Sequence, residues 1–128
     1  MAVLGFTTVS SKLKEQAETV KTKEIEAYGV SVIDDLDGKN EVIKSSNAQL
    51  HLFMQLKRGN ITHMIFQSPE EVEAFFTNIT DYFGKEKAGK AMSAPECIAV
   101  GGSEEALKAR GMLKIRTSDS FLDAISSI

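Results

Sequence analysis

The stretch of residues 61–84 constrains the fold more than any other part of the chain. It opens with an apolar, β-branched run that ends at Phe66, which is typical of a strand buried on both faces. Ser68 then precedes Glu71 by three residues, with a proline between them, and this pattern predicts a capped helix start. Apolar side chains follow at helical spacing as far as Gly84, which predicts an amphipathic helix that ends there. A buried strand followed at once by such a helix is half of a βαβ unit.

Strand and helix patterns alternate along the rest of the chain. Strands are predicted at residues 2–6, 30–33, 61–66, 96–100 and 112–115, and helical patterns follow them, with glycine stops at Gly29, Gly59, Gly84 and Gly111. Residues 85–93 are polar and rich in Gly and Lys, which predicts a surface loop. Alternation at this spacing favours right-handed crossovers. We therefore predict an α/β fold: a single doubly wound, mostly parallel five-stranded sheet with helices on both faces, in the flavodoxin-like strand order 2-1-3-4-5.

Length and composition indicate one domain over residues 1–128 and exclude several classes of protein. The chain is 42% hydrophobic and 26% charged, as is ordinary for a soluble globular domain. Its net charge of −3 argues against nucleic acid as a partner, since binding normally needs a basic patch. No apolar run is long enough to cross a membrane, and the start lacks the apolar region of a signal peptide. We expect a soluble protein of the cytoplasm or of an organellar stroma or matrix.

Loops that follow the carboxyl ends of parallel strands are where ligands bind in open α/β sheets. In this chain they are expected at residues 7–11, 34–38, 67–69, 101–103 and 117–118. Four of them carry hydroxyl groups or glycine and open a helix, whose free amides suit a carboxylate or a phosphate. The candidate ligand-binding residues are Thr7, Thr8, Ser68, Gly101, Ser103 and Ser118. Ordinary helix capping also accounts for Ser and Thr at any one of these loops.

Several sharper chemistries lack their residues. A phosphoreceiver domain needs acidic residues where this chain has Thr7 and Thr8, and an Asp where it has Gln67. Neither glycine-rich phosphate motif occurs, and no glycine stands in the loop after the first strand, which argues against nucleotide or flavin. His51 and His63 have no partner at metal-ligand spacing. We therefore predict no metal site, no cofactor and no catalytic residue.

The same motifs resemble those of uroporphyrinogen-III synthase, the tetrapyrrole-pathway enzyme that cyclises hydroxymethylbilane. The family's Phe-Thr-Ser-Pro-like turn and following helix are matched by Phe66-Gln67-Ser68-Pro69, then Val72 and Phe75. AVGGSEEALKARG and KIRTSDSFLDAI are similar to the family's later strands and helices, and MAVLGFTT and AYGVSVIDD to its first two strands. The resemblance covers most of the chain and is strongest over residues 50–125. It carries over residue by residue to Ser68, Gly101 and Ser103.

The chain also departs from the family. Family enzymes have two such domains and hold the tetrapyrrole between them, whereas this chain is long enough for only one. Gln67 replaces the family's Thr, and Glu104 stands near where the family tends to place a Thr. A carboxylate at that place would repel a substrate rich in carboxylates.

Together, the resemblance and its departures favour a single-domain, non-catalytic relative of uroporphyrinogen-III synthase that acts as a binding or accessory subunit in a larger complex. Its partner would be another protein of the assembly, or a tetrapyrrole or small anionic ligand at the loop edge. Two alternatives remain open. One is a lyase of the uroporphyrinogen-III synthase type, completed by homodimerisation. The other is a flavodoxin-like protein that binds a small anion or a flavin.

Overall fold

A computed structural model of the chain describes residues 3–9, 26–32 and 47–128. Its strands are β1 (Val3–Val9), β2 (Glu26–Val32), β3 (His63–Phe66), β4 (Glu96–Ala99) and β5 (Ile115–Thr117). They form one sheet in the order β2-β1-β3-β4-β5, and every neighbouring pair is parallel. The predicted α/β fold with a parallel sheet is confirmed.

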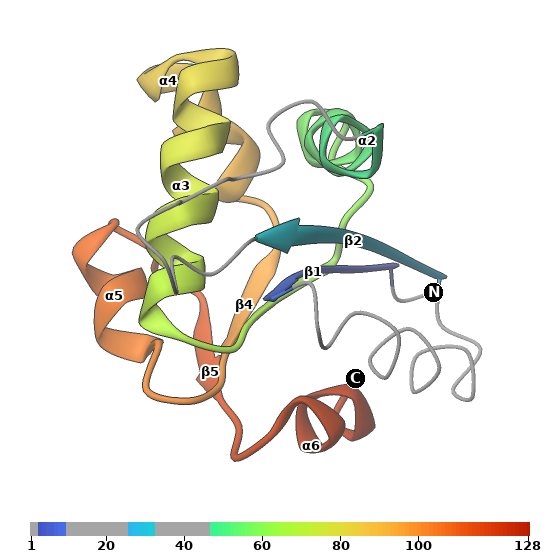
Figure 1. Ribbon diagram of the computed structural model, residues 1–128, viewed down its shortest axis with the longest axis vertical. Helices are drawn as coiled ribbons and strands as arrows, with labels where there is room; N and C mark the ends of the chain where they lie inside the picture. Colours follow the sequence, from blue (N-terminus) through green and yellow to red (C-terminus); the bar gives the residue numbers. More distant parts are fainter. Residues whose placement is uncertain (1–2, 10–25, 33–46) are drawn as a thin grey trace.

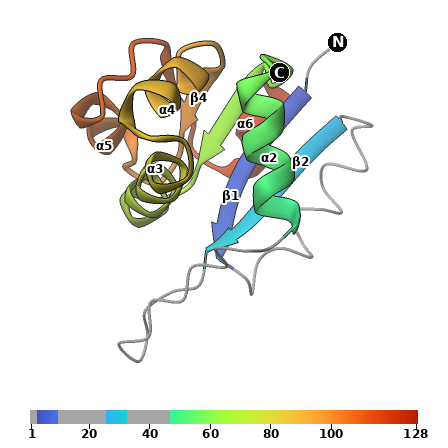
Figure 2. The same cartoon turned by 90° about the horizontal axis from the view of Figure 1, so that it is seen from above.

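Helices cover both faces of this sheet. The described helices are α2 (Asn47–Lys57), α3 (Pro69–Phe83), α4 (Lys85–Met92), α5 (Glu104–Ala109) and α6 (Phe121–Ser126). Figure 1 shows α2 to α5 on one side of the sheet and α6 on the other, and Figure 2 shows α2 lying across β1 and β2. No helix in the described ranges is long and apolar enough to cross a membrane.

The side chains of β3 alternate between two hydrophobic cores, as they must in a sheet covered on both faces. Met64 and Phe66 belong to the core beneath α2 to α5. Ile65, between them, belongs to the core beneath α6, where it joins Phe121 and Ile125. The continuous apolar run in the sequence follows from this double burial.

The β3–α3 unit follows the sequence prediction closely. Ser68 accepts a hydrogen bond from the Glu71 backbone N–H at 3.2 Å, and Pro69 is the first helical residue. At the other end, the Gly84 N–H donates to the Thr80 carbonyl at 2.7 Å. The buried face is made by Val72, Phe75, Phe76 and Ile79. The Glu71 carboxylate also accepts from the Gln67 N–H, at 2.9 Å, and so ties the helix start to the end of β3.

The prediction of a surface loop at residues 85–93 is wrong, because most of this segment is helix α4. Ala88, Ala91 and Met92 are buried and lie at helical spacing, so that α4 packs through one narrow face. The lysines and Gly89 occupy the exposed side of the helix. Their abundance concealed the short apolar face.

Several predicted boundaries are also wrong. β1 continues to Val9, so Thr7 and Thr8 lie in a strand and not in the loop that follows it. β2 begins at Glu26, which places Gly29 inside a strand and not at the end of a helix. The last strand lies at Ile115–Thr117, a few residues later than predicted. The predicted first helix, apart from its last residues, and the loops at Ser10–Ser11 and residues 34–38 lie outside the described residues.

Gly5 allows α2 to approach the sheet. A Cβ atom at this position of β1 would collide with the Met64 sulfur and would lie 2.9 Å from Leu52 Cδ1. Leu52 belongs to α2 and is fully buried. The absent side chain is therefore a packing requirement at the junction of β1, β3 and α2.

Candidate functional site

The loops that follow β3 and β4 are in direct contact at the carboxyl edge of the sheet. The Phe66 carbonyl accepts hydrogen bonds from the Val100 N–H at 2.8 Å and from the Ser103 hydroxyl at 3.0 Å. Gly101 lies so close to the Gln67 backbone that a Cβ there would collide with the Gln67 carbonyl oxygen. The structure thus brings the predicted residues Gly101 and Ser103 against the turn that holds Ser68.

Ser103 joins these loops through its side chain. It is completely buried, and its hydroxyl donates to the Val100 carbonyl at 2.8 Å as well as to Phe66. The sequence predicted a helix cap at this residue, but its side chain caps no amide of α5. A buried hydroxyl whose proton is shared between two carbonyls contributes to the fold, and it is not presented to a ligand.

Ser68 and the amides around it are largely engaged within the turn. The Ser68 oxygen takes the Glu71 N–H, the Ser68 carbonyl takes the Val72 N–H, and the Glu71 carboxylate takes the Gln67 N–H. Glu71 is only 4% exposed, so its charge lies directly beneath the turn. The amides of Gln67, Glu71 and Val72, which could otherwise bind an anion at this helix start, are therefore already satisfied.

The prediction that Ser118 caps the last helix is wrong. Ser120 does so, since its hydroxyl oxygen accepts from the Asp123 N–H at 3.0 Å. The Ser118 N–H instead donates to the Ala99 carbonyl at 2.9 Å and extends the pairing of β4 with β5. Ser118 therefore lies beside the β4 loop.

Thr7 and Thr8 lie in β1, where their backbones pair with Val30 and Ser31 of β2. β1 pairs with β3 on the flank away from β4 and β5. Of the six predicted residues, the structure groups Ser68, Gly101 and Ser103, with Ser118 on the neighbouring strand end.

The carboxyl edge carries acidic residues at two helix starts. Glu70 and Glu71 lie in the first turn of α3, and Glu104 and Glu105 lie in the first turn of α5. Lys108 pairs with Glu104 at 2.8 Å on the outer side of α5. Carboxylates stabilise helix N-termini, but here they also oppose the approach of a second anion.

The other ionisable groups in the interior do not form a reactive centre. Burial, with a smaller contribution from Glu96, raises the pKa of the Cys97 thiol to about 12, so the thiol stays protonated. Burial also lowers the pKa of His63, although Glu96 opposes this effect. Among the described residues, no cluster of three or more His, Cys, Asp or Glu side chains could hold a metal ion.

A pocket at the amino-terminal end of the sheet was not anticipated from the sequence. It lies between α2 and α4, and three lysines line it. The sequence does not predict it, because a loop at residues 85–93 gives their side chains no common direction.

Comparison with known proteins assigns no family, since no protein-family model, curated protein or solved structure matches the chain.

Proposed function

We propose that the chain is a flavodoxin-like, single-domain relative of uroporphyrinogen-III synthase that acts as a non-catalytic accessory subunit of a larger assembly. The proposal joins the motif resemblance to the state of the carboxyl edge. There, the Ser103 hydroxyl and the amides of Gln67 and Glu71 are satisfied by the chain itself. This internal satisfaction is the observation that carries the proposal, because a catalytic edge needs groups left for its substrate.

The charge at this edge favours a protein partner over a tetrapyrrole. Hydroxymethylbilane-type molecules are rich in carboxylates, and they would meet the acidic first turns of α3 and α5. A protein surface with basic residues would instead complement those turns. Charge complementarity of this kind steers association and gives specificity.

An activity assay tests the non-catalytic part of the proposal. The purified protein is incubated with hydroxymethylbilane, and the type III isomer is measured beside a two-domain uroporphyrinogen-III synthase as positive control. We expect no type III isomer above the spontaneous background. Sedimentation over a range of concentrations shows whether a dimer forms under the assay conditions. Turnover by a dimer would overturn the proposal in favour of the homodimeric enzyme.

A charge-reversal experiment tests the accessory part. Glu70→Lys and Glu105→Lys together change the carboxyl edge, and both residues are exposed. Glu86→Lys makes the same kind of change on exposed α4, away from that edge. We expect the edge variant to lose the protein that co-purifies with the wild type from the native source, and the Glu86 variant to retain it. Equal recovery of the co-purifying protein by both variants would show that the carboxyl edge does not bind it.

A further inference from the structure

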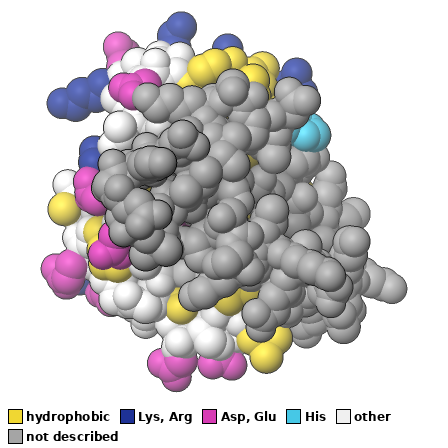
Figure 3. Space-filling view, in the orientation of Figure 1, with side chains coloured by type: hydrophobic (Ala, Val, Ile, Leu, Met, Phe, Trp, Pro, Cys, Tyr) yellow, Lys and Arg dark blue, Asp and Glu magenta, His cyan; other side chains and the backbone are white. Residues whose placement is uncertain are grey.

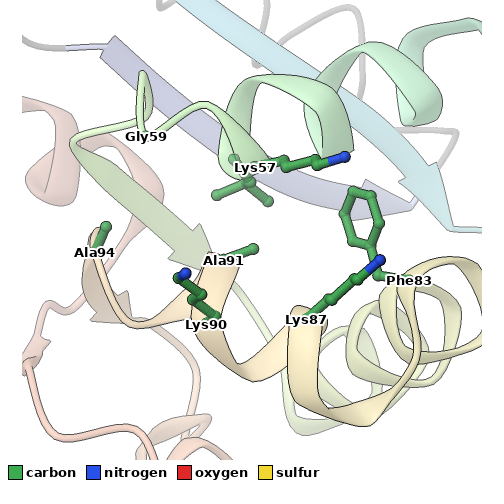
Figure 4. A pocket seen from close by; sticks show the side chains of 8 residues that line it. Lys57, Gly59, Phe83, Lys87, Lys90, Ala91 and Ala94 are labelled. Atoms are coloured by element: carbon green, nitrogen blue, oxygen red, sulfur yellow. The ribbon is translucent and has the colours of Figure 1, made fainter.

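A pocket of about 340 Å³ lies between α2 and α4, on the side of the molecule opposite the carboxyl-edge loops. Both helices end near it and lead into the amino-terminal ends of β3 and β4. Figure 4 shows that its walls come from these two helices, with Phe83 contributed by the end of α3. The volume is within the range of small-molecule sites, near its lower end.

The inner surface of this pocket is apolar. Leu56 and Ala91 form part of it and are buried, and the half-buried Phe83 ring forms another part. The Lys57 ammonium lies 5.9 Å from the centre of the Phe83 ring, within the range of a cation–π contact. An apolar molecule placed here would cover surface that water otherwise wets.

Three cations surround the apolar surface. Lys57 projects from α2, while Lys87 and Lys90 project from α4 (Figure 4). Among the residues that the structure describes, no acidic side chain lines the pocket, and no ion pair involves any of these lysines. Figure 3 shows dark-blue cationic side chains beside hydrophobic ones at the top of the molecule, the end that carries α4. A local positive field therefore surrounds an apolar floor in a chain of net charge −3.

Helix capping accounts for only part of this arrangement. Lys57 and Lys90 lie in the last turns of α2 and α4, where an ammonium group offsets the helix dipole. Lys87 lies ahead of the last turn, where its charge does not offset the helix dipole. Capping also gives no reason for an open apolar space between the helices.

We propose that this pocket binds a small amphipathic anion, an organic carboxylate with a compact apolar body. The apolar body would lie on Leu56, Phe83 and Ala91, and the lysines would hold the carboxylate through charge-assisted hydrogen bonds. A neutral molecule would leave the three positive charges uncompensated. An inorganic anion would leave the apolar floor wet.

A matched pair of ligands tests this chemistry. The ¹⁵N-labelled protein is titrated with 2-naphthoate, with neutral 2-naphthamide and with inorganic phosphate, and amide shifts are followed by NMR. We expect 2-naphthoate to bind at least tenfold more tightly than either control, with shifts concentrated in α2 and α4. Equal binding of the carboxylate and the amide would overturn the proposal, as would shifts located elsewhere.

Variants separate the pocket from the general charge of the surface. Lys57→Gln, Lys87→Gln and Lys90→Gln combined should weaken 2-naphthoate binding at least tenfold, and the three corresponding Arg substitutions should preserve it. Lys85→Gln with Lys114→Gln removes exposed charge outside the pocket and should leave binding unchanged. Unaltered affinity in the triple Gln variant would refute the assignment.

Two further experiments test the pocket independently of the lysine substitutions. Ala94 lines the pocket and is exposed, so Ala94→Trp should block binding without disturbing the core. This variant decides the question even if the triple substitution impairs folding. Vesicles containing phosphatidylglycerol offer the same anionic and apolar chemistry in a membrane, and we expect no co-sedimentation with them. Vesicle binding without 2-naphthoate binding would replace the small ligand by a lipid surface.

Discussion

At the scale of single residues, Gly101 and Gly102 differ in one respect that can be measured. Both have positive φ angles, of 61° and 79°, so an alanine at either position incurs backbone strain. Only at Gly101 would the new Cβ also collide with a backbone atom, the Gln67 carbonyl oxygen. At Gly102 the same atom would meet nothing within 4 Å.

We expect Gly101→Ala to lower the free energy of unfolding by about 1–3 kcal/mol more than Gly102→Ala, because overpacking adds to the strain that both share. Urea denaturation of the two variants and the wild type measures the difference. Equal losses would mean that the β3 and β4 loops are not in close contact.

Cys97 gives a second prediction at this scale. Its side chain is 1% exposed, and burial raises its pKa to about 12, so very little thiolate forms near neutral pH. We expect iodoacetamide at about pH 8 to leave the native thiol unmodified and to alkylate it once denaturant unfolds the protein. Rapid alkylation without denaturant would contradict the buried position of β4.

At the candidate site, residue types alone predict where side chains lie along the chain but not which groups they contact. The structure places Ser68 and Ser103 at the ends of neighbouring strands, as predicted, because parallel strands end at a common edge, and their role in ligand binding stays a prediction. The sequence did not show that the Ser103 hydroxyl would turn inward to the Phe66 carbonyl, a residue 37 positions away. That choice depends on how closely two loops approach, which no local pattern records.

At the scale of secondary-structure elements, α4 was missed and α3 was predicted closely. α3 carries a cap, a proline at its start and a glycine at its end, all readable within a few residues. α4 has no side-chain cap, and its apolar face consists of Ala88, Ala91 and Met92. Between Ser118 and Ser120, tertiary hydrogen bonding decides which residue caps α6.

Gly89 tests whether α4 is a helix in solution. It lies within α4, and a Cβ there would meet nothing within 4 Å. We expect Gly89→Ala to raise the free energy of unfolding by roughly 0.5–1 kcal/mol, because alanine favours the helical conformation and restricts the unfolded chain.

Gly84→Ala is the matched control for this prediction. Gly84 also has open space around it, but its φ angle is 88°, so alanine should destabilise the protein there. Thermal and urea unfolding measure both variants. A loss of stability in Gly89→Ala would favour a loop over residues 85–93.

At the scale of the whole molecule, the alternation of strands and helices identified the fold class, because parallel strands need crossovers. The two cores on opposite faces of β3 follow from the same logic. Both depend on the overall pattern and tolerate errors of several residues at each boundary. The candidate functional surfaces do not tolerate such errors, since their side chains come from elements far apart in the chain.

Global stability should depend on pH through His63. Burial lowers its pKa in the folded state below the ordinary value of 6.5, so the unfolded chain binds more protons as the pH falls through this region. The folded state should therefore lose stability as the pH falls below 6.5, and regain it as the pH rises again. Unfolding free energies of the wild type and of His63→Gln, measured between about pH 5 and about pH 7.5, test this linkage. We expect the variant to show a shallower acid loss, whereas parallel profiles would rule out a contribution from His63.

The bare backbone at Gly5 also affects the far side of α2. Because β1 has no side chain there, Leu52 of α2 packs directly over Gly5, beside Met64 of β3. We expect Gly5→Ala to displace the Leu52 and Met64 side chains, and any shift of α2 that followed would change the spacing between Lys57 and the lysines of α4. If the pocket binds 2-naphthoate as proposed, the affinity of Gly5→Ala for this ligand would then report on how closely α2 packs against the sheet.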